Sequence, residues 1–274
     1  MVTIAIPTYN RYNILKLMSE SLYKSNLDSH CNIRIYDDCS KEFGLSELKK
    51  LFPDAASIRI NEVNLKSDKN IFSVYNDFLS TSDKYLFNAD SDLIFSNNWL
   101  SKGLELIENT DGILTLFNAS SHPPLNILND TFCIKKHIGS AGTFFTRKRV
   151  EEIIDYFNKN KISDDYSIDW KWSEYFFMNN VRIFCTNKSL VQHIGFIGQN
   201  SNYFYDYGRN FTVDSVEQGQ VINDIFEQYI ENVCNLEEKH KKDLMFNLRR
   251  CLIIIMRKIM PKKIFENIKE KYNR

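Results

Sequence analysis

Two aspartates, Asp90 and Asp92, stand one residue apart in the stretch YLFNADSDLIF, directly after an apolar run. Oxygen ligands suit a hard divalent cation, which keeps open positions for phosphate oxygens when only one or two carboxylates hold it. Two other interpretations are open: an ordinary solvated turn, or a calcium or magnesium site of unspecified kind. An EF-hand loop is disfavoured, because its glycine at the sixth position and its glutamate at the twelfth are missing.

The elements that must position these aspartates alternate between strands and helices. Strand-like apolar runs lie within residues 2–10, 31–40, 57–63 and 84–95, with helix-like runs between them. This order predicts an α/β fold around a mostly parallel central sheet flanked by helices. Ligands bind beyond the carboxyl ends of the strands in such sheets. Three polar clusters follow strand-like runs and are expected to converge there: Pro7–Arg11, Asp37–Ser40 and Asp90–Asp92.

The composition disfavours several classes of protein. The chain has 274 residues, 43% of them hydrophobic, which allows a substantial core, and its net charge of zero gives no general attraction to nucleic acid. Its six cysteines lack metal-binding spacing and are typical of reduced, cytosolic thiols. No Walker loop and no G-x-S-x-G elbow occurs. Without a signal peptide or an apolar run of ~18 residues, we expect a soluble, cytoplasmic protein, at most peripheral to a membrane.

The order and spacing of IAIPTYNR, YDDCS and FNADSD resemble the nucleotide-binding half of GT-A-fold glycosyltransferases, particularly those of family 2. The resemblance covers residues 2–198. It implies a Rossmann-like GT-A catalytic domain over residues 1–212, with a nucleotide-binding half (1–98) and an acceptor half (99–212). A helical, basic and amphipathic extension over residues 213–274 would follow.

The resemblance also implies roles for individual residues. In that family the Pro-Thr-Tyr-Asn turn and the Asp pair hold the nucleoside, and the D-x-D motif binds the diphosphate through Mn²⁺ or Mg²⁺. Asp92 would be the direct metal ligand, and Asp90 would lie between ribose and metal. His193, in the string VQHIG, would complete the metal site; the alternative is a satisfied core histidine. The implied nucleotide-binding residues are Pro7, Thr8, Tyr9, Arg11, Asp37, Asp38, Lys69, Asp90 and Ser91.

Two segments are less clearly matched. The loop DKNIFSVYN lacks the glycine of the family's N-x-G-I segment, so Lys69 is either a phosphate or base contact or a solvated loop charge. The segment HIGSAGTFF contains Gly139 and Gly142, where a backbone can approach a sugar closely. By resemblance, Ser140, Ala141 and Gly142 are candidates for the wall that faces the donor sugar and the acceptor.

Asp169, in SIDWKWSEYF, is the candidate general base. Inverting transfer needs a carboxylate to deprotonate the acceptor hydroxyl, and enzymes that this chain resembles often place one beside a Trp. The alternatives for this role are Glu174 and Asp165. Trp170 or Trp172 would then offer an apolar platform for a sugar face. If the segment is an ordinary amphipathic helix instead, Trp170 and Phe176 are buried and Asp169 is solvated.

These residues together predict a metal-dependent, inverting glycosyltransferase, a hexosyltransferase of the EC 2.4 type. It would move a sugar from a UDP-linked donor to a hydroxyl of a glycan or lipid-linked glycan acceptor in bacterial polysaccharide or glycoconjugate biosynthesis. One alternative is a sugar-nucleotide pyrophosphorylase, although IPTYNRYN lacks the Gly-rich loop of that class. The other is a catalytically silent nucleotide-sugar-binding partner subunit. The intact Asp90, Asp92, Asp169 and His193 favour the enzyme.

The C-terminal tail is strongly basic. Residues 239–274 contain about a dozen Lys and Arg against the acids Asp243, Glu266 and Glu270. A basic amphipathic helix can lie on an anionic membrane surface. The alternative is a helix that packs on the catalytic domain or on a second subunit, with its charges solvated.

Overall fold

The computed structural model describes residues 1–27, 30–160, 168–195 and 206–228, and the single residues 230, 231, 235, 241, 242, 244 and 245. The chain divides into two compact units, Met1–Ile222 and Asn223–Arg274. All labelled elements belong to the first unit. The predicted domain boundaries, including the boundary at residue 212, stay predictions. Among the described helices, none is long and apolar enough to cross a membrane.

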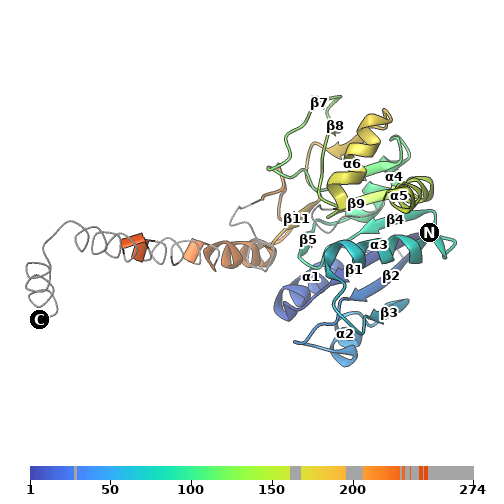
Figure 1. Cartoon of the computed structure of the whole chain (residues 1–274). Coiled ribbons are helices and arrows are strands. Elements are labelled where there is room, and N and C mark those ends of the chain that lie inside the picture. The colour runs from blue at the N-terminus through green and yellow to red at the C-terminus, as the bar shows by residue number, and fades with distance from the viewer. Residues whose placement is uncertain are drawn as a thin grey trace, which may run out of the picture. The chain divides into compact units, whose positions relative to one another are not determined.

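A nine-stranded sheet forms the centre of the first unit, in the order β3-β2-β1-β4-β9-β6-β10-β8-β7 (Figure 1). Its strands are β1 (Val2–Thr8), β2 (Cys31–Asp37), β3 (Ser57–Ile60), β4 (Tyr85–Asn88), β6 (Ile113–Thr115), β7 (Asn126–Ile127), β8 (Phe132–Lys135), β9 (Thr143–Thr146) and β10 (Ile183–Thr186). Only β8 and β9 run against the common direction. The predicted α/β class with a mostly parallel sheet is therefore confirmed.

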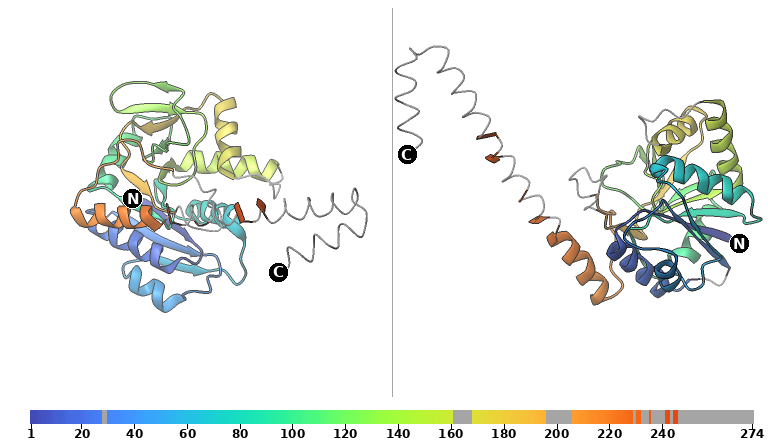
Figure 2. Two further views of the ribbon diagram at one scale, coloured as in Figure 1. Left: turned by 90° about the vertical axis from the view of Figure 1, so that its left-hand side faces the viewer. Right: turned by 60° about the horizontal axis from the view of Figure 1, so that its bottom comes forward.

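Helices cover both faces of this sheet. On one face lie α1 (Tyr12–Lys24), α2 (Leu45–Leu51) and α4 (Trp99–Ile107); on the other lie α3 (Lys66–Leu79), α5 (Arg147–Lys159) and α6 (Ile168–Met178). Figure 2 shows the first group, in blue and green, and the second, in cyan to yellow, around the strands. Each helix buries an apolar stripe at helical spacing, such as Leu15, Met18 and Leu22 of α1.

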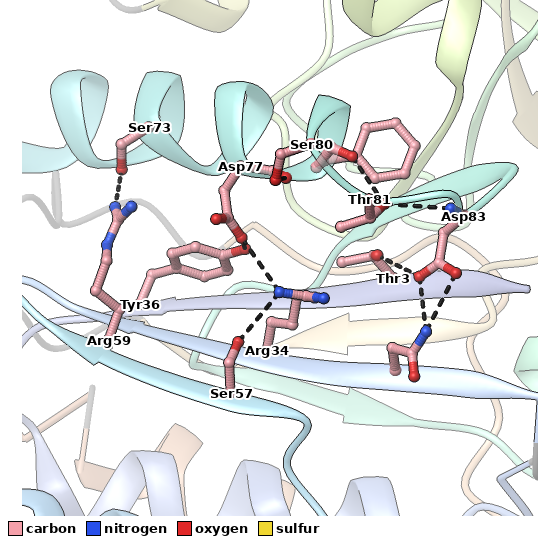
Figure 3. Close-up of polar contacts among 12 residues, drawn as sticks. Thr3, Arg34, Tyr36, Ser57, Arg59, Ser73, Asp77, Ser80, Thr81 and Asp83 are labelled. Atoms are coloured by element: carbon pink, nitrogen blue, oxygen red, sulfur yellow. Dashed lines mark hydrogen bonds and ion pairs between the residues drawn. The ribbon is translucent and has the colours of Figure 1, made fainter.

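Polar contacts attach α3 to the neighbouring strands (Figure 3). The hydroxyl of Tyr36 on β2 donates to Asp77 Oδ2 at 2.6 Å, and Arg34 Nη1 lies 3.5 Å from the same oxygen. Beyond the helix, Thr3 Oγ1 on β1 donates to Asp83 Oδ2 at 2.7 Å. Because these side chains are largely withdrawn from water, the contacts of Asp77 fix the position of α3 on the sheet, and the bond to Asp83 fixes the segment that follows the helix.

The segment 84–95, expected to contain one strand, forms two. After β4, the chain turns at residues 89–92 and continues as β5 (Leu93–Phe95), which pairs with β11 (Val191–His193) in a separate antiparallel sheet. The turn with Asp90 and Asp92 therefore lies between two sheets. The hairpin of β7 and β8 was not expected, because its strands are short and carry no clear alternation.

Candidate active site

The turn between β4 and β5 is fixed by backbone hydrogen bonds at both ends. The N–H of Ala89 donates to Ala5 O on β1 at 2.8 Å, and the N–H of Ile194, next to β11, donates to Asp92 O at 2.8 Å. The carboxylates thus stand on a turn that three strands hold rigidly. This is the carboxyl end of β4, where the α/β fold predicts a ligand site.

Asp92 contacts two basic side chains from distant parts of the sequence. Arg11 Nη2 lies 3.0 Å from Asp92 Oδ2, and His193 Nε2 lies 3.2 Å from Oδ1. Burial by itself would raise the pKa of Asp92, but His193 and Arg11 outweigh it and hold that pKa well below its usual range. Asp92 in turn raises the pKa of His193, against the effect of burial. The structure thus brings together three residues that the sequence assigned to one site.

The pair Asp92 and His193 has the chemistry of a divalent-cation site, including a carboxylate oxygen that is left for a further ligand. Asp92 Oδ1 is buried and accepts no well-aligned hydrogen bond from the described residues, although His193 Nε2 is close. Carboxylate oxygen and imidazole nitrogen are both metal-ligand types. Across the described ranges, no group of three or more His, Cys, Asp and Glu side chains is spaced to hold a metal. The pair therefore suits a cation whose remaining ligands are phosphate oxygens and water.

Gly195 is a site residue that sequence reasoning missed. A Cβ added there would overlap Asp92 Oδ2 and lie 2.9 Å from His193 Cε1. No side chain can occupy that space unless the Asp92 carboxylate moves. The only sequence signal was a glycine two residues after the candidate histidine.

Gly195→Ala is expected to push Asp92 away from its present position. Overpacking of this kind lowers the free energy of unfolding by about 1–3 kcal/mol. Chemical denaturation measures this loss, and nucleotide-induced thermal shifts with Mn²⁺ measure the expected drop in affinity. Gly219→Ala is the matched control, because its Cβ would meet Val213 at an ordinary 3.6 Å. Wild-type stability and nucleotide binding in Gly195→Ala would show that the carboxylate does not depend on this glycine.

Asp90 has a different environment from Asp92. Asn88 Nδ2 donates to Asp90 Oδ1 at 2.8 Å and to the carbonyl of Ser140 at 3.3 Å. Burial and the charge of Asp92 raise the pKa of Asp90 to about 7. Ser91 between them is buried. The two carboxylates therefore differ in charge near neutral pH, and Asn88, which sequence reasoning did not single out, orients Asp90.

Asp169 lies in the first turn of α6, partly buried, so the alternative of a solvated Asp169 is wrong. The backbone N–H groups of Trp170 and Ser140 donate to its carboxylate, the former at 2.9 Å. Burial, with a smaller contribution from Asp68, raises the pKa of Asp169 to about 6. Asp68 accepts a hydrogen bond from the backbone N–H of Ile168 and so holds the start of α6 against α3.

The other candidates for the base are less well placed or undescribed. Glu174 is exposed on α6. Asp165 lies outside the described residues. A carboxyl with a pKa near 6 is ionised at neutral pH and still basic enough to accept a proton, which favours Asp169 over an ordinary solvated carboxylate.

The predicted nucleoside residues lie at the neighbouring strand ends. Thr8 on β1 is paired with Asp37 on β2, and the N–H of Asp38 donates to Thr8 O at 2.9 Å. Asp37 accepts hydrogen bonds from the backbone and side chain of Ser40. Asp38 Oδ1 accepts from Asn61 and from the backbone N–H of Leu65, at 2.9 and 2.7 Å. Both carboxylates thus shape the loops around this end of the sheet.

The remaining nucleoside candidates border the same strand ends. Pro7 and Tyr9, on either side of Thr8, are partly buried. Lys69 is exposed on α3, next to Asn70, whose Nδ2 donates to the carbonyl of Tyr36 at 3.1 Å. The structure therefore places Lys69 close to the end of β2, and its role as a phosphate or base contact stays a prediction.

The tryptophans of α6 have opposite environments. Trp172 is fully buried and packs edge-on against Phe145, whereas Trp170 is 48% exposed. The alternative with Trp170 buried is therefore wrong, and of the two expected platforms only Trp170 is accessible. Gly142 has a left-handed backbone (φ +65), and a Cβ there would lie 2.7 Å from Val191 Cγ2. Close packing on β11 is enough to explain this glycine.

Comparisons with known proteins identify the family and the fold. The profile described as Glycosyl transferase family 2 matches residues 3–162. No curated protein matches the sequence. Among solved structures, residues 1–349 of S. aureus TarS superpose with a TM-score of 0.50 at 16% identity, covering 76% of this chain and 60% of that one.

Two further structures share the fold. The mannosyltransferase PcManGT from Pyrobaculum calidifontis, in complex with GDP-Man and Mn²⁺, has a TM-score of 0.52 at 13% identity, covering 74% of this chain and 58% of that one. GalNAc-T7 with UDP, GalNAc and Mn²⁺ has a TM-score of 0.54 at 11% identity, covering 70% of this chain and 43% of that one. This chain thus spans less than two thirds of each of these proteins. At such identities the likeness shows the fold, which is GT-A.

Proposed function

The chain belongs to glycosyl transferase family 2, and on that premise we propose that it is a metal-dependent, inverting enzyme acting on a nucleotide-linked sugar. The observation that supports this best is the convergence of Asp92, His193 and Arg11 at the carboxyl end of β4, with Asp169 nearby. We propose UDP as the nucleotide and a hydroxyl of a glycan or lipid-linked glycan as the acceptor. Bacterial polysaccharide or glycoconjugate assembly is the proposed setting.

Known ligands of the structural relatives support the donor class. The complexes of PcManGT and GalNAc-T7 contain GDP-Man or UDP together with Mn²⁺. In this chain Asp92 and His193 would hold Mn²⁺ or Mg²⁺, while Arg11 places a guanidinium, which suits phosphate oxygens, at the same edge. The bound cation would neutralise the charge that develops on the departing diphosphate.

The proposed reaction is a direct displacement. Asp169 accepts the proton of the acceptor hydroxyl as its oxygen forms a bond to the anomeric carbon of the donor sugar. The bond between that carbon and the diphosphate oxygen breaks at the same time, with its electron pair going to the diphosphate. Attack opposite the leaving group inverts the anomeric configuration. The hydrogen bonds from Trp170 and Ser140 keep the Asp169 carboxylate in place.

A thermal-shift screen tests this proposal. UDP-, GDP-, dTDP- and CMP-sugars are each added with and without Mn²⁺. A ligand at 100 times its Kd stabilises the folded state by about 2.7 kcal/mol, so the correct nucleotide should stand out. We expect the largest shift with a UDP-sugar and Mn²⁺ together. If no nucleotide sugar shifts the transition, the proposed function is wrong.

The transfer rate should depend on pH through Asp169. Its pKa of about 6, raised by burial, requires the carboxyl to lose its proton before it can act as base. We expect kcat to fall about tenfold per pH unit below pH 6 and to level off above it. In the Asp90→Asn variant, Asp90 no longer titrates and Asp169 still does. The fall in kcat below about pH 6 should therefore remain in this variant. A flat profile between pH 5 and 8 would argue against Asp169.

The basic tail of the C-terminal extension, residues 239–274, lies mostly outside the described residues. We propose that it contacts either an anionic membrane surface, on the cytoplasmic face, or a second subunit. Deleting the residues after Pro261 should weaken sedimentation with vesicles that contain anionic lipid, because each Lys or Arg near such a surface contributes about 1 kcal/mol. Neutral vesicles are the control. Unchanged binding to anionic vesicles would show that the tail does not bind the membrane.

A further inference from the structure

Three aromatic side chains from distant parts of the chain meet beside Asp169. The indole of Trp170, on α6, stacks on the imidazole of His137, with ring centroids 4.5 Å apart and planes inclined by 27°. His122 lies 5.9 Å from the same indole. His137 follows β8, and His122 lies in the loop between β6 and β7. Trp170 is 48% exposed, so the histidines support a ring that still offers accessible surface.

The two histidines give this cluster little charge. Burial lowers the pKa of His122 and of His137, and the nearby Lys135 and Lys136 lower them further. The acids that oppose this effect, Asp206 at His122 and Glu174 at His137, do not reverse it. Both imidazoles are therefore neutral at pH 7. Moreover, Nδ1 of His137 is buried and, within the described residues, has no hydrogen-bond partner, so the imidazole rests against the indole mainly by stacking.

A short strip of chain, His137–Ser140, links this stack to the proposed site. Its backbone N–H at Ser140 donates to Asp169, and its carbonyl at Ser140 accepts from Asn88, which also binds Asp90. At the other end of the strip, the imidazole of His137 stacks on the indole of Trp170. The backbone N–H of Trp170 donates to the Asp169 carboxylate. A ring bound on Trp170 would therefore lie at the same end of α6 as the Asp169 carboxylate.

We propose that Trp170, supported by His137, is the platform that binds an uncharged pyranose ring of the acceptor. The apolar C–H face of a pyranose suits a neutral aromatic surface, and the three rings themselves carry no cation that would pair with the phosphate of a polyol phosphate. A rigid platform also reduces the ordering cost of binding. The proposal rests on the proposed glycosyl transfer, and it adds the chemical class of the acceptor and the residues that select it.

Ligand-observed NMR on the full chain tests the platform. The probes are the methyl glycosides of glucose, galactose, mannose and N-acetylglucosamine, with ribitol phosphate as the charged comparison. At least one glycoside should bind the wild type more tightly than ribitol phosphate does. Trp170→Ala should weaken that binding about tenfold, the upper range for an aromatic contact, and His137→Ala by a smaller factor.

Controls separate this platform from folding and from the donor site. Phe177→Ala is the matched control, because Phe177 is also 48% exposed on α6 and should be replaceable without effect on glycoside binding. Thermal shifts with UDP and Mn²⁺ should be equal in all variants. The platform is overturned if no glycoside binds the wild type, if ribitol phosphate binds more tightly, or if Trp170→Ala binds as the wild type does. A missing nucleotide shift in the wild type would instead overturn the proposed function.

Discussion

Replacing Asp169 with asparagine is expected to lower the transfer rate by about 10²–10⁴-fold while leaving nucleotide-sugar affinity nearly unchanged. Asparagine keeps the shape and the acceptor oxygen that Trp170 and Ser140 bind, but it cannot accept a proton from the acceptor hydroxyl. Release of the free nucleotide measures the rate, and calorimetric titration with the nucleotide sugar measures the affinity. Glu174→Gln, on the same helix but exposed, should keep wild-type activity.

Stability provides an independent control for Asp169→Asn. The pKa of this carboxyl is raised from 3.8 to about 6 in the folded protein, so the folded state binds the proton more tightly than the unfolded chain does. Ionising Asp169 therefore lowers stability as pH rises from about 4 to about 6, and the cost persists at pH 7. The neutral amide removes that cost, so the variant should unfold no more easily than the wild type at pH 7. Joint loss of stability, donor binding and transfer would indicate a structural role instead.

Asp92→Ala is expected to abolish the metal-dependent part of nucleotide-sugar affinity and to reduce transfer by about 10²–10³-fold or more. Asp92 is the carboxylate that Arg11 and His193 keep ionised, and among the described residues its Oδ1 has no well-aligned hydrogen bond to lose. Thermal shifts by UDP, measured with and without Mn²⁺, should coincide in the variant. In the wild type, Mn²⁺ should enlarge the shift.

Two variants sharpen the test of Asp92. Asp92→Asn keeps the size of the side chain and removes its charge, so it should also lose the Mn²⁺ effect without opening a cavity. Asp90→Asn should retain part of that effect, because Asp90 is oriented by Asn88 and is only partly ionised near pH 7. Circular dichroism and thermal midpoints check that each variant folds. Full activity and full metal-dependent UDP affinity in Asp92→Ala would show that the metal assignment is wrong.

Much of the architecture could be predicted from local patterns. The alternation of strand-like and helix-like runs, with apolar spacings such as Leu15, Met18 and Leu22, predicted the α/β fold and the positions of most elements. It also placed the polar clusters at strand ends. The hairpin of β7 and β8 escaped prediction, because strands of two and four residues are too short to show a period.

The neighbours of the candidate residues could not be predicted in the same way. His193 was assigned to the site by resemblance, but its contact with Asp92 depends on β5 leaving the main sheet to pair with β11. The exposure of Trp170 and the burial of Trp172, two residues apart, depend on which face of α6 meets the sheet. A weakly amphipathic sequence does not specify that face. Gly195 stood out only when the space beside Asp92 was known.

The sequence by itself determined the fold class, the strand ends where ligands bind and the residue types available there, because backbone periodicity and hydrophobic burial are local properties. Only the tertiary structure decided which charges meet. Asp90 and Asp92 are chemically identical side chains one residue apart, yet their pKa values shift in opposite directions. The difference arises because Arg11 and His193, each at least 80 residues from Asp92 in sequence, contact the Asp92 carboxylate directly, whereas burial and the charge of Asp92 dominate at Asp90.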